Sequence, residues 1–161
     1  MKDITIERVE DESDLKDFIN LPFKIYEKDP YWVPPLISDQ KALFSRKNPF
    51  FEHAEAAFFI AKKNGIPAGR IVAIVNYKHL EFHNEKAGFF GFFETVHDNT
   101  VAGELLDKTR EWLKDKGMEI MRGPMNFSTN EECGFLVEGF DTSPFLMMPY
   151  NPPYYIEIVE R

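Results

Sequence analysis

The 161-residue chain contains a single cysteine, Cys133, and no long hydrophobic run. One cysteine cannot form an internal disulfide, and the N-terminus begins no apolar stretch of the kind found in secretory signals. A membrane-spanning helix needs about 20 mainly apolar residues. The longest apolar stretch, residues 54–61, is interrupted by Glu55. We therefore expect a cytoplasmic protein that does not span a membrane.

Positive charge is also scarce, and it is not clustered. The chain has 19 lysines and arginines against 27 aspartates and glutamates, a net charge of -8, and its basic residues occur singly or in pairs such as Lys62-Lys63. Such a chain repels phosphate backbones and anionic lipid headgroups, so we expect no nucleic-acid partner. His79 and His83 are the closest of the four histidines but have no third ligand nearby, so we also expect no metal.

The length and apolar content fit one domain over residues 1–161. Two β-rich runs, 56–63 and 66–75, are joined by Asn64-Gly65, which accepts positive φ and predicts a two-residue hairpin. Residues 87–95 carry four phenylalanines, which predicts a central strand covered on both faces.

Periodicity and capping signals predict the remaining elements. They are a strand over 4–9, a helix over 11–19 capped by Ser13 and ended by Pro22, a helix over 101–116, a strand over 118–122, a short helix opened by a capping box at Ser128 and Glu131, a strand over 145–148, and a helix capped by Asn151. The short helix would place Cys133 on its apolar stripe, where a thiol is a buried hydrophobe and not a nucleophile.

Residues 29–51 combine four prolines with aromatic residues such as Trp32 and Phe44. Flexible linkers do not carry this many aromatics, so the composition predicts a buried, loop-rich segment. Two roles remain open for it: a wall that binds the acceptor, or a cover packed over one edge of the sheet.

The order of these elements resembles the GNAT N-acetyltransferase superfamily from residue 4 to about residue 148. The spacing is a sharper match: when Leu105-Leu106 is set on the leucine pair of that family, Leu113 and Gly117 fall where its pattern has an apolar residue and a glycine. Residues 29–34 and 123–127 are also similar to a poorly characterised bacterial group with this fold. The resemblance implies an α/β (α+β) fold with a mixed central sheet flanked by helices, and acyl-CoA as co-substrate.

The loop that holds the donor's diphosphate in that family is altered here. In the same register it reads His-Asp-Asn-Thr-Val-Ala over 97–102, without the family's arginine and first two glycines. The residues that the resemblance assigns to donor binding are Phe93, Asn99, Thr100, Val101 and Ala102. Asp98 adds a negative charge beside the expected phosphates. The alternative is that these polar residues only cap the helix that follows.

Acyl transfer from a thioester to an amine needs a base for the ammonium, donors for the carbonyl oxygen and an acid for the thiolate, but no metal. Glu94 ends the central strand beside the gap into which the resembling enzymes insert the donor, so it is the candidate base. Asn126 follows the next strand across the same gap and is the candidate orienting residue, with Ser128 as a weaker one. Tyr150 is the candidate acid, with Tyr154 and Tyr155 as alternatives.

Two functional hypotheses remain open. The first is an N-acyltransferase that uses a CoA-type thioester and an amine or other small-molecule acceptor. The second is a GNAT-like domain that has lost donor binding and serves as a structural or binding half of a larger protein. Residues 152–161 begin a helix but contain no terminating glycine, so we expect a homodimer or a missing C-terminal half.

Overall fold

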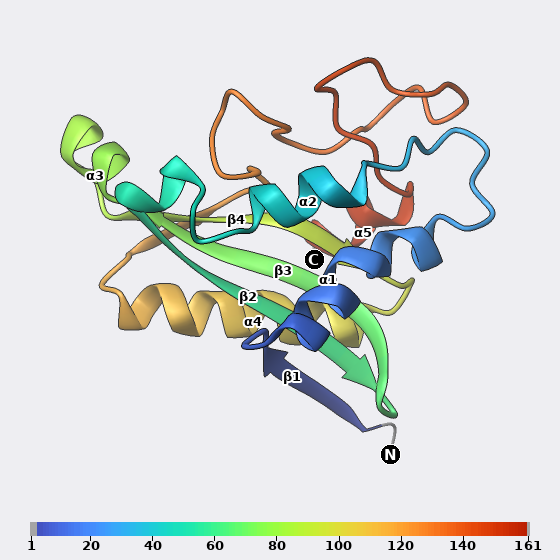
Figure 1. The fold of residues 1–161 in the computed structure, drawn as a ribbon, viewed down its shortest axis with the longest axis horizontal. Helices are drawn as coiled ribbons and strands as arrows, with labels where there is room; N and C mark the ends of the chain where they lie inside the picture. Colours follow the sequence, from blue (N-terminus) through green and yellow to red (C-terminus); the bar gives the residue numbers. More distant parts are fainter. Residues whose placement is uncertain (1–2, 161) are drawn as a thin grey trace.

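Within residues 3–160, five strands form one mixed sheet in the order in which they occur along the chain (Figure 1). A computed structural model describes residues 3–160. The strands are β1 (Ile4–Arg8), β2 (Ala54–Lys63), β3 (Ile66–Asn76), β4 (Ala87–Thr95) and β5 (Ile120–Arg122). The pairs from β1 to β4 are antiparallel, whereas β4 and β5 are parallel. The predicted mixed sheet, with β4 between the hairpin and the following strand, is confirmed.

Helices cover both faces of this sheet (Figure 1). On one face α4 (Asn99–Asp115) packs its buried stripe of Val101, Leu105 and Leu113 against β2 and β3. On the other face lie α1 (Glu12–Ile25) and α2 (Ile37–Leu43). The parallel pairing of β4 with β5 follows from the crossover through α4. The smaller elements are a 3-10 helix (Pro49–Glu52), α3 (Tyr77–His83) and α5 (Tyr154–Val159).

The hairpin prediction is confirmed residue by residue at its turn. Asn64 and Gly65 have φ of 52 and 78, the left-handed values that a two-residue turn of this type needs. The four phenylalanines of β4 are at most 7% exposed. Phe89 and Phe92 join the core beneath α1, and Phe90 and Phe93 join the core beneath α4. Both faces of β4 are therefore covered, as predicted.

A bulge interrupts β4 near its carboxyl end. Arg70 pairs with Glu94 and Val72 pairs with Gly91, so two residues of β4 stand opposite one residue of β3, and Phe92 has a φ of 50. Segment 123–127 lies directly against this bulge. A Cβ at Gly91 would lie 2.2 Å from the carbonyl oxygen of Met125, so only glycine permits this approach.

The structure corrects three predictions at the N-terminal side. The first helix does not stop before Pro22 but runs through it, and its cap is Asp11, which accepts from Asp14 N at 2.9 Å, and not Ser13. Burial of Phe18 and Leu21 offsets the hydrogen bond that proline cannot make. Segment 29–51 is only partly buried: Phe44 is in the core, but no residue of α2 is buried.

The C-terminal predictions are corrected more extensively. Residues 128–139 form turns and bends instead of a helix, because Met125 bridges Cys133 in an antiparallel pairing, and Cys133 is exposed. Residues 145–148 form no strand and are exposed at their side chains. Asn151 does not cap the last helix; its amide oxygen instead accepts from Leu136 N at 2.7 Å and anchors the loop. None of the helices within residues 3–160 has the length and apolar character of a membrane span.

Candidate functional site

A cavity of about 280 Å³ lies at the carboxyl end of β4, on the side where β5 no longer pairs with it. Its walls come from the end of α1, from segment 32–35, from α2, and from the long segment between β5 and α5. Its polar lining consists of Gln40, Arg70, Glu94, Asn126, Glu131, Glu132, Tyr150, Asn151 and Tyr155, and most of the remaining lining is apolar. A mainly apolar cavity with a few convergent polar groups is the usual form of a small-molecule site.

Glu94 projects from β4 into this cavity and is held by two tyrosines from elements far apart in the sequence. The hydroxyls of Tyr26, which follows α1, and Tyr155, in α5, donate to Glu94 Oε2 at 2.9 and 2.7 Å. Burial raises the pKa of Glu94 to about 7, against the opposing effects of the Arg70 charge and of these two hydrogen bonds. At neutral pH this carboxyl therefore exchanges a proton readily.

The two tyrosines are firmly protonated. Burial, reinforced by the neighbouring Glu94 charge, raises the pKa of both Tyr26 and Tyr155 well above the usual value. Each hydroxyl therefore acts as a neutral hydrogen-bond donor to Glu94. Trp32 stacks on Tyr26 with ring centroids 4.8 Å apart, which fixes the orientation of that donor.

Asn126 connects the loop after β5 to the bulge. Its Oδ1 accepts from Phe92 N at 2.7 Å, and its Nδ2 donates to Glu132 Oε2 at 3.3 Å. Glu132 is exposed on its loop, yet partial desolvation beside the cavity raises its pKa. Because the side chain of Asn126 is engaged at both ends, it fixes the shape of this cavity wall.

Tyr150 lies in another part of the cavity wall and holds two loops together there. Its hydroxyl contacts both carboxylate oxygens of Asp29, at 2.9 and 2.8 Å, and so joins two loops that are 121 residues apart. Burial, with the Asp29 hydrogen bond second, raises the pKa of Tyr150. Tyr154 stacks on His97 and donates to Thr95 O at 2.7 Å, and burial raises the pKa of Tyr154 to about 12.

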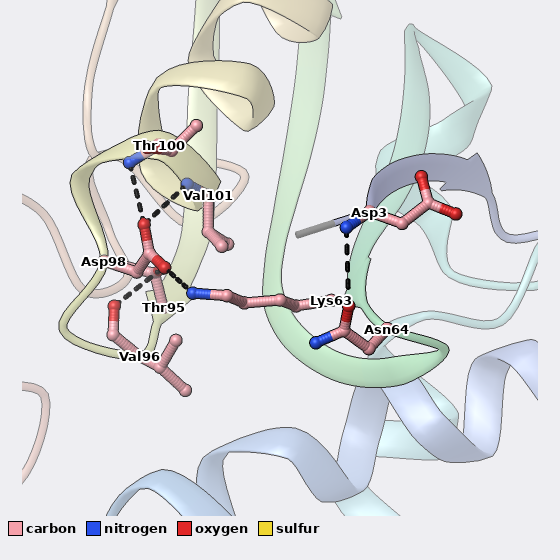
Figure 2. A network of polar contacts seen from close by, with 8 residues as sticks. All are labelled: Asp3, Lys63, Asn64, Thr95, Val96, Asp98, Thr100 and Val101. Carbon is pink, nitrogen blue, oxygen red and sulfur yellow. Dashed lines mark hydrogen bonds and ion pairs between the residues drawn. The ribbon is translucent and has the colours of Figure 1, made fainter. Parts of the chain in front are cut away.

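The N-terminus of α4 is already occupied by a side chain of the protein (Figure 2). Asp98 Oδ1 accepts from Thr100 N at 3.0 Å and from Val101 N at 3.4 Å, and Asp98 Oδ2 is paired with Lys63 from the β2–β3 hairpin. The Lys63 contact lowers the pKa of Asp98 more than these backbone contacts do. The amides that a diphosphate would use are therefore bonded to an internal carboxylate, which that anion would have to displace.

The edge of β4 that faces away from β3 is also engaged by side chains. Asn126 accepts from Phe92 N, the Tyr155 hydroxyl accepts from Thr95 N at 2.7 Å, and Tyr154 donates to Thr95 O. Three backbone groups along this edge thus have partners from within the chain.

The structure brings together only part of the predicted site. Glu94, Asn126, Phe93 and Tyr150 line the same cavity, as does Tyr155. The other predicted donor-binding residues lie at the start of α4 and not in the cavity lining: Asn99 and Thr100 are exposed, and Val101 and Ala102 are completely buried. Ser128 also lies outside the lining.

Sequence reasoning missed Tyr26, Arg70 and Glu132. Arg70 carried a usable signal, because a charged residue inside a run that is buried on both faces needs a nearby partner. Tyr26 gave no such signal, since only the packing of α1 across the sheet brings it to β4. Within residues 3–160, no group of three or more histidine, cysteine or acidic side chains is arranged to hold a metal.

The fold as a whole superposes on solved acetyltransferase structures. The chain superposes on the aminoglycoside N-acetyltransferase AAC(6')-Iy in complex with CoA with a TM-score of 0.54, at 16% identity over 81% of this chain and 80% of that one. An aminoglycoside acetyltransferase from an uncultured soil metagenomic sample, in complex with sisomicin, gives 0.50 at 18% identity over 74% and 75%. The chain has the GNAT acetyltransferase fold. The predicted GNAT architecture is therefore confirmed.

Two proteins that are more similar in sequence are longer than this chain, which matches part of each. The chain is 38% identical over 149 residues to Protein YghO of Escherichia coli K12, covering 92% of this chain and 38% of that protein. It is 37% identical over 154 residues to the bacterial ceramide synthase of Caulobacter vibrioides, covering 94% and 40%. The chain thus spans about two fifths of the length of these relatives. No family model matches it.

Proposed function

We propose that this domain transfers an acyl group from a CoA-type thioester to an amine, and that Glu94 is the base that takes a proton from the amine. The position of Glu94 carries the proposal: it is a carboxylate in the polar part of a cavity, at the end of β4 in a GNAT fold, with its pKa raised by burial to about 7. A general base is most effective when its pKa lies near the working pH.

The hydrogen bonds around Glu94 suit this role. Both tyrosine hydroxyls donate to Oε2, and no other hydrogen bond to this carboxylate is made by the described residues, which leaves Oε1 able to receive a proton. As the amine attacks the thioester carbonyl, a carbon–nitrogen bond forms and the nitrogen becomes acidic enough to lose a proton to Oε1. The carbon–sulfur bond then breaks, and CoA leaves as a thiolate that takes up a proton from an acid in the cavity or from water. The tyrosines keep the carboxylate oriented while its charge changes.

Asn126 and Tyr150 have supporting roles in this proposal. Asn126 holds the loop after β5 against the bulge, which shapes the wall beside Glu94. Tyr150 as the acid for the thiolate stays a prediction. A phenol with a raised pKa holds its proton more tightly than a thiol, whose pKa is about 8.5, so Tyr150 would donate poorly to the thiolate. Its hydrogen bond to Asp29 favours a role in closing the cavity instead.

The acceptor is proposed to be an amine with an apolar part. Ceramide is the amide of a long-chain amino alcohol, so the name of the Caulobacter relative describes an N-acylated amine product. Val33, Met147 and Met148 line the present cavity and are 57%, 52% and 47% exposed. These side chains offer an apolar path from the surface to the polar groups around Glu94.

One observation favours a second function, a domain without donor binding that supports another catalytic unit. Asp98 occupies the amides at the start of α4, and tyrosines of α5 occupy Thr95 on the edge of β4. Side chains of the protein itself thus occupy the two places where a GNAT fold would bind its donor.

A direct assay separates the two functions. The protein is incubated with acyl-CoA of short and long chain and with a panel of primary amines, and release of free thiol is followed together with amide formation. Under the first proposal, Glu94→Gln lowers the rate by about 10²- to 10⁴-fold. The same exchange at Glu104, exposed on α4, leaves it unchanged. Thiol release that is equal in wild type and Glu94→Gln would exclude Glu94 as the base.

A further inference from the structure

Among the described residues that line the cavity, Arg70 is the one lysine, arginine or histidine, and it shares that lining with three carboxyl groups, Glu94, Glu131 and Glu132. It is only 5% exposed. A guanidinium retains its charge even when buried, and a buried charge is costly without compensation. The position of Arg70 relative to the carboxylates therefore affects the pKa of these groups.

The strand register places Arg70 directly opposite Glu94. The two residues are cross-strand partners between β3 and β4, on the same face of the sheet. Their side chains nevertheless form no ion pair within the described part of the chain. Arg70 Nη1 donates instead to Phe18 O at 2.8 Å, its guanidinium lies 4.8 Å from the centre of the Phe18 ring, and Nε is buried without a hydrogen-bond partner. The charge is fixed beside Glu94 but not bonded to it.

The other groups around Glu94 do not supply a positive charge. Tyr26, which follows α1, and Tyr155, from α5, are neutral donors, and Tyr154 lies next to Tyr155 in α5. Glu132, on the loop after β5, acts in the opposite direction because its negative charge raises the pKa of Glu94. Arg70 is thus the cation that opposes desolvation of Glu94.

We propose that Arg70 is a positioning residue whose fixed, buried charge favours the ionised form of the Glu94 carboxylate. The charge coupling itself is a property of the fold. Its consequence, that Glu94 stays able to accept a proton from the acceptor amine, rests on the proposed function. Arg70 acts through Glu94 and does not itself contact the reacting atoms.

The coupling is measured without any substrate by ¹³C NMR titration of glutamate carboxyl carbons, with the Glu94 signal assigned by its loss in Glu94→Gln. In Arg70→Gln the titration midpoint of Glu94 rises by about one pH unit or more. In Arg70→Lys, which keeps the charge, it stays close to the wild-type midpoint. Arg110→Gln, which removes an exposed arginine paired with Asp107, leaves it unchanged.

Two outcomes overturn the inference: an unchanged midpoint in Arg70→Gln, or an equal shift in Arg70→Lys. If Arg70→Gln does not fold at pH 8, the double variant with Glu94→Gln is expected to fold, because it removes the uncompensated carboxylate, and its failure to fold overturns the inference as well. The proposed function is judged separately. The titration midpoint of Glu94 could depend on Arg70 even if the protein releases no thiol from acyl-CoA. That combination supports the coupling and rejects the base role of Glu94.

Discussion

The Tyr155 hydroxyl lies 2.7 Å from Glu94 Oε2 and 2.7 Å from Thr95 N, so one side chain of α5 donates to the candidate base and accepts from the strand that carries it. This single hydroxyl couples the last helix to the end of β4. It also explains how residues 61 positions apart maintain the geometry of the site.

Removing this hydroxyl tests the coupling. In Tyr155→Phe, we expect a rise in the Glu94 pKa, and a free energy of unfolding lower by about 1 to 3 kcal/mol because Thr95 N loses its partner. Tyr154→Phe is the matched control, since the Tyr154 hydroxyl contacts Thr95 O but not Glu94. Chemical denaturation and NMR titration measure the two effects. Equal pKa changes in both variants would contradict the assignment.

The stability of the protein is expected to fall as the pH rises from about 4.5 to about 7. The pKa of Glu94 is raised from 4.5 to about 7 in the folded state, so in this interval the folded state binds more protons than the unfolded state. The stabilisation is fully present below the unfolded pKa and is lost as the pH passes the folded pKa. The contribution of Glu94 is about 3 kcal/mol.

Glu94→Gln is expected to remove this part of the pH dependence, because a neutral amide accepts the tyrosine hydrogen bonds at every pH. Denaturant unfolding of wild type and Glu94→Gln at several pH values from 4.5 to 8 makes the comparison. Glu104→Gln serves as control. Parallel curves for Glu94→Gln and wild type would show that burial does not perturb this carboxyl.

Binding of CoA to the unmodified chain is expected to be weak, and Asp98→Gly is expected to strengthen it. The exchange removes one negative charge and one Cβ, frees Thr100 N and Val101 N, and releases Lys63 from its ion pair. Loss of the cap to glycine costs only a few tenths of a kcal/mol. Asp98→Asn, which keeps a capping oxygen without the charge, separates the two effects. Calorimetric titration that finds tight binding by the wild type would contradict this prediction.

Gly91→Ala is expected to destabilise the fold by about 2 kcal/mol or more, because its Cβ would lie 2.2 Å from Met125 O and neither backbone can move without opening the bulge. Gly103→Ala is the matched control on α4, where nothing lies within 4 Å of the new Cβ. There we expect stabilisation of up to about 1 kcal/mol. Thermal unfolding of both variants decides whether the bulge is as tightly packed as described.

The purified chain is expected to self-associate, or to be stabilised by further residues when it is part of a longer protein. Phe145 and Leu146 are 82% and 92% exposed and lie in the chain between Pro144 and Met147, which line the cavity. Exposed apolar side chains of this size favour association. Sedimentation velocity of wild type and of the double variant Phe145→Ser Leu146→Ser measures the effect. A wild type that sediments as a monomer at every concentration would reject self-association.

The sequence by itself determined the β2–β3 hairpin, the covered strand β4 and the helix α4, because those signals are local. Asn64-Gly65 defines the hairpin, the phenylalanines of 87–95 require cover on both faces, and the stripe from Val101 to Leu113 is read from helical spacing alone. The loops after β5 could not be predicted in the same way. Their capping pattern at Ser128 is overruled by a bridge between Met125 and Cys133 and by contacts from Asn151.

Only the tertiary structure decided the site. Glu94 was identifiable as a strand-end carboxylate, but its raised pKa depends on packing by Tyr26, Arg70 and Tyr155, which come from three other elements. Periodicity reports which face of an element is buried and not which distant side chain meets it there. The proton affinity of a group is set by those neighbours and by desolvation, and both exist only after the sheet and helices have assembled.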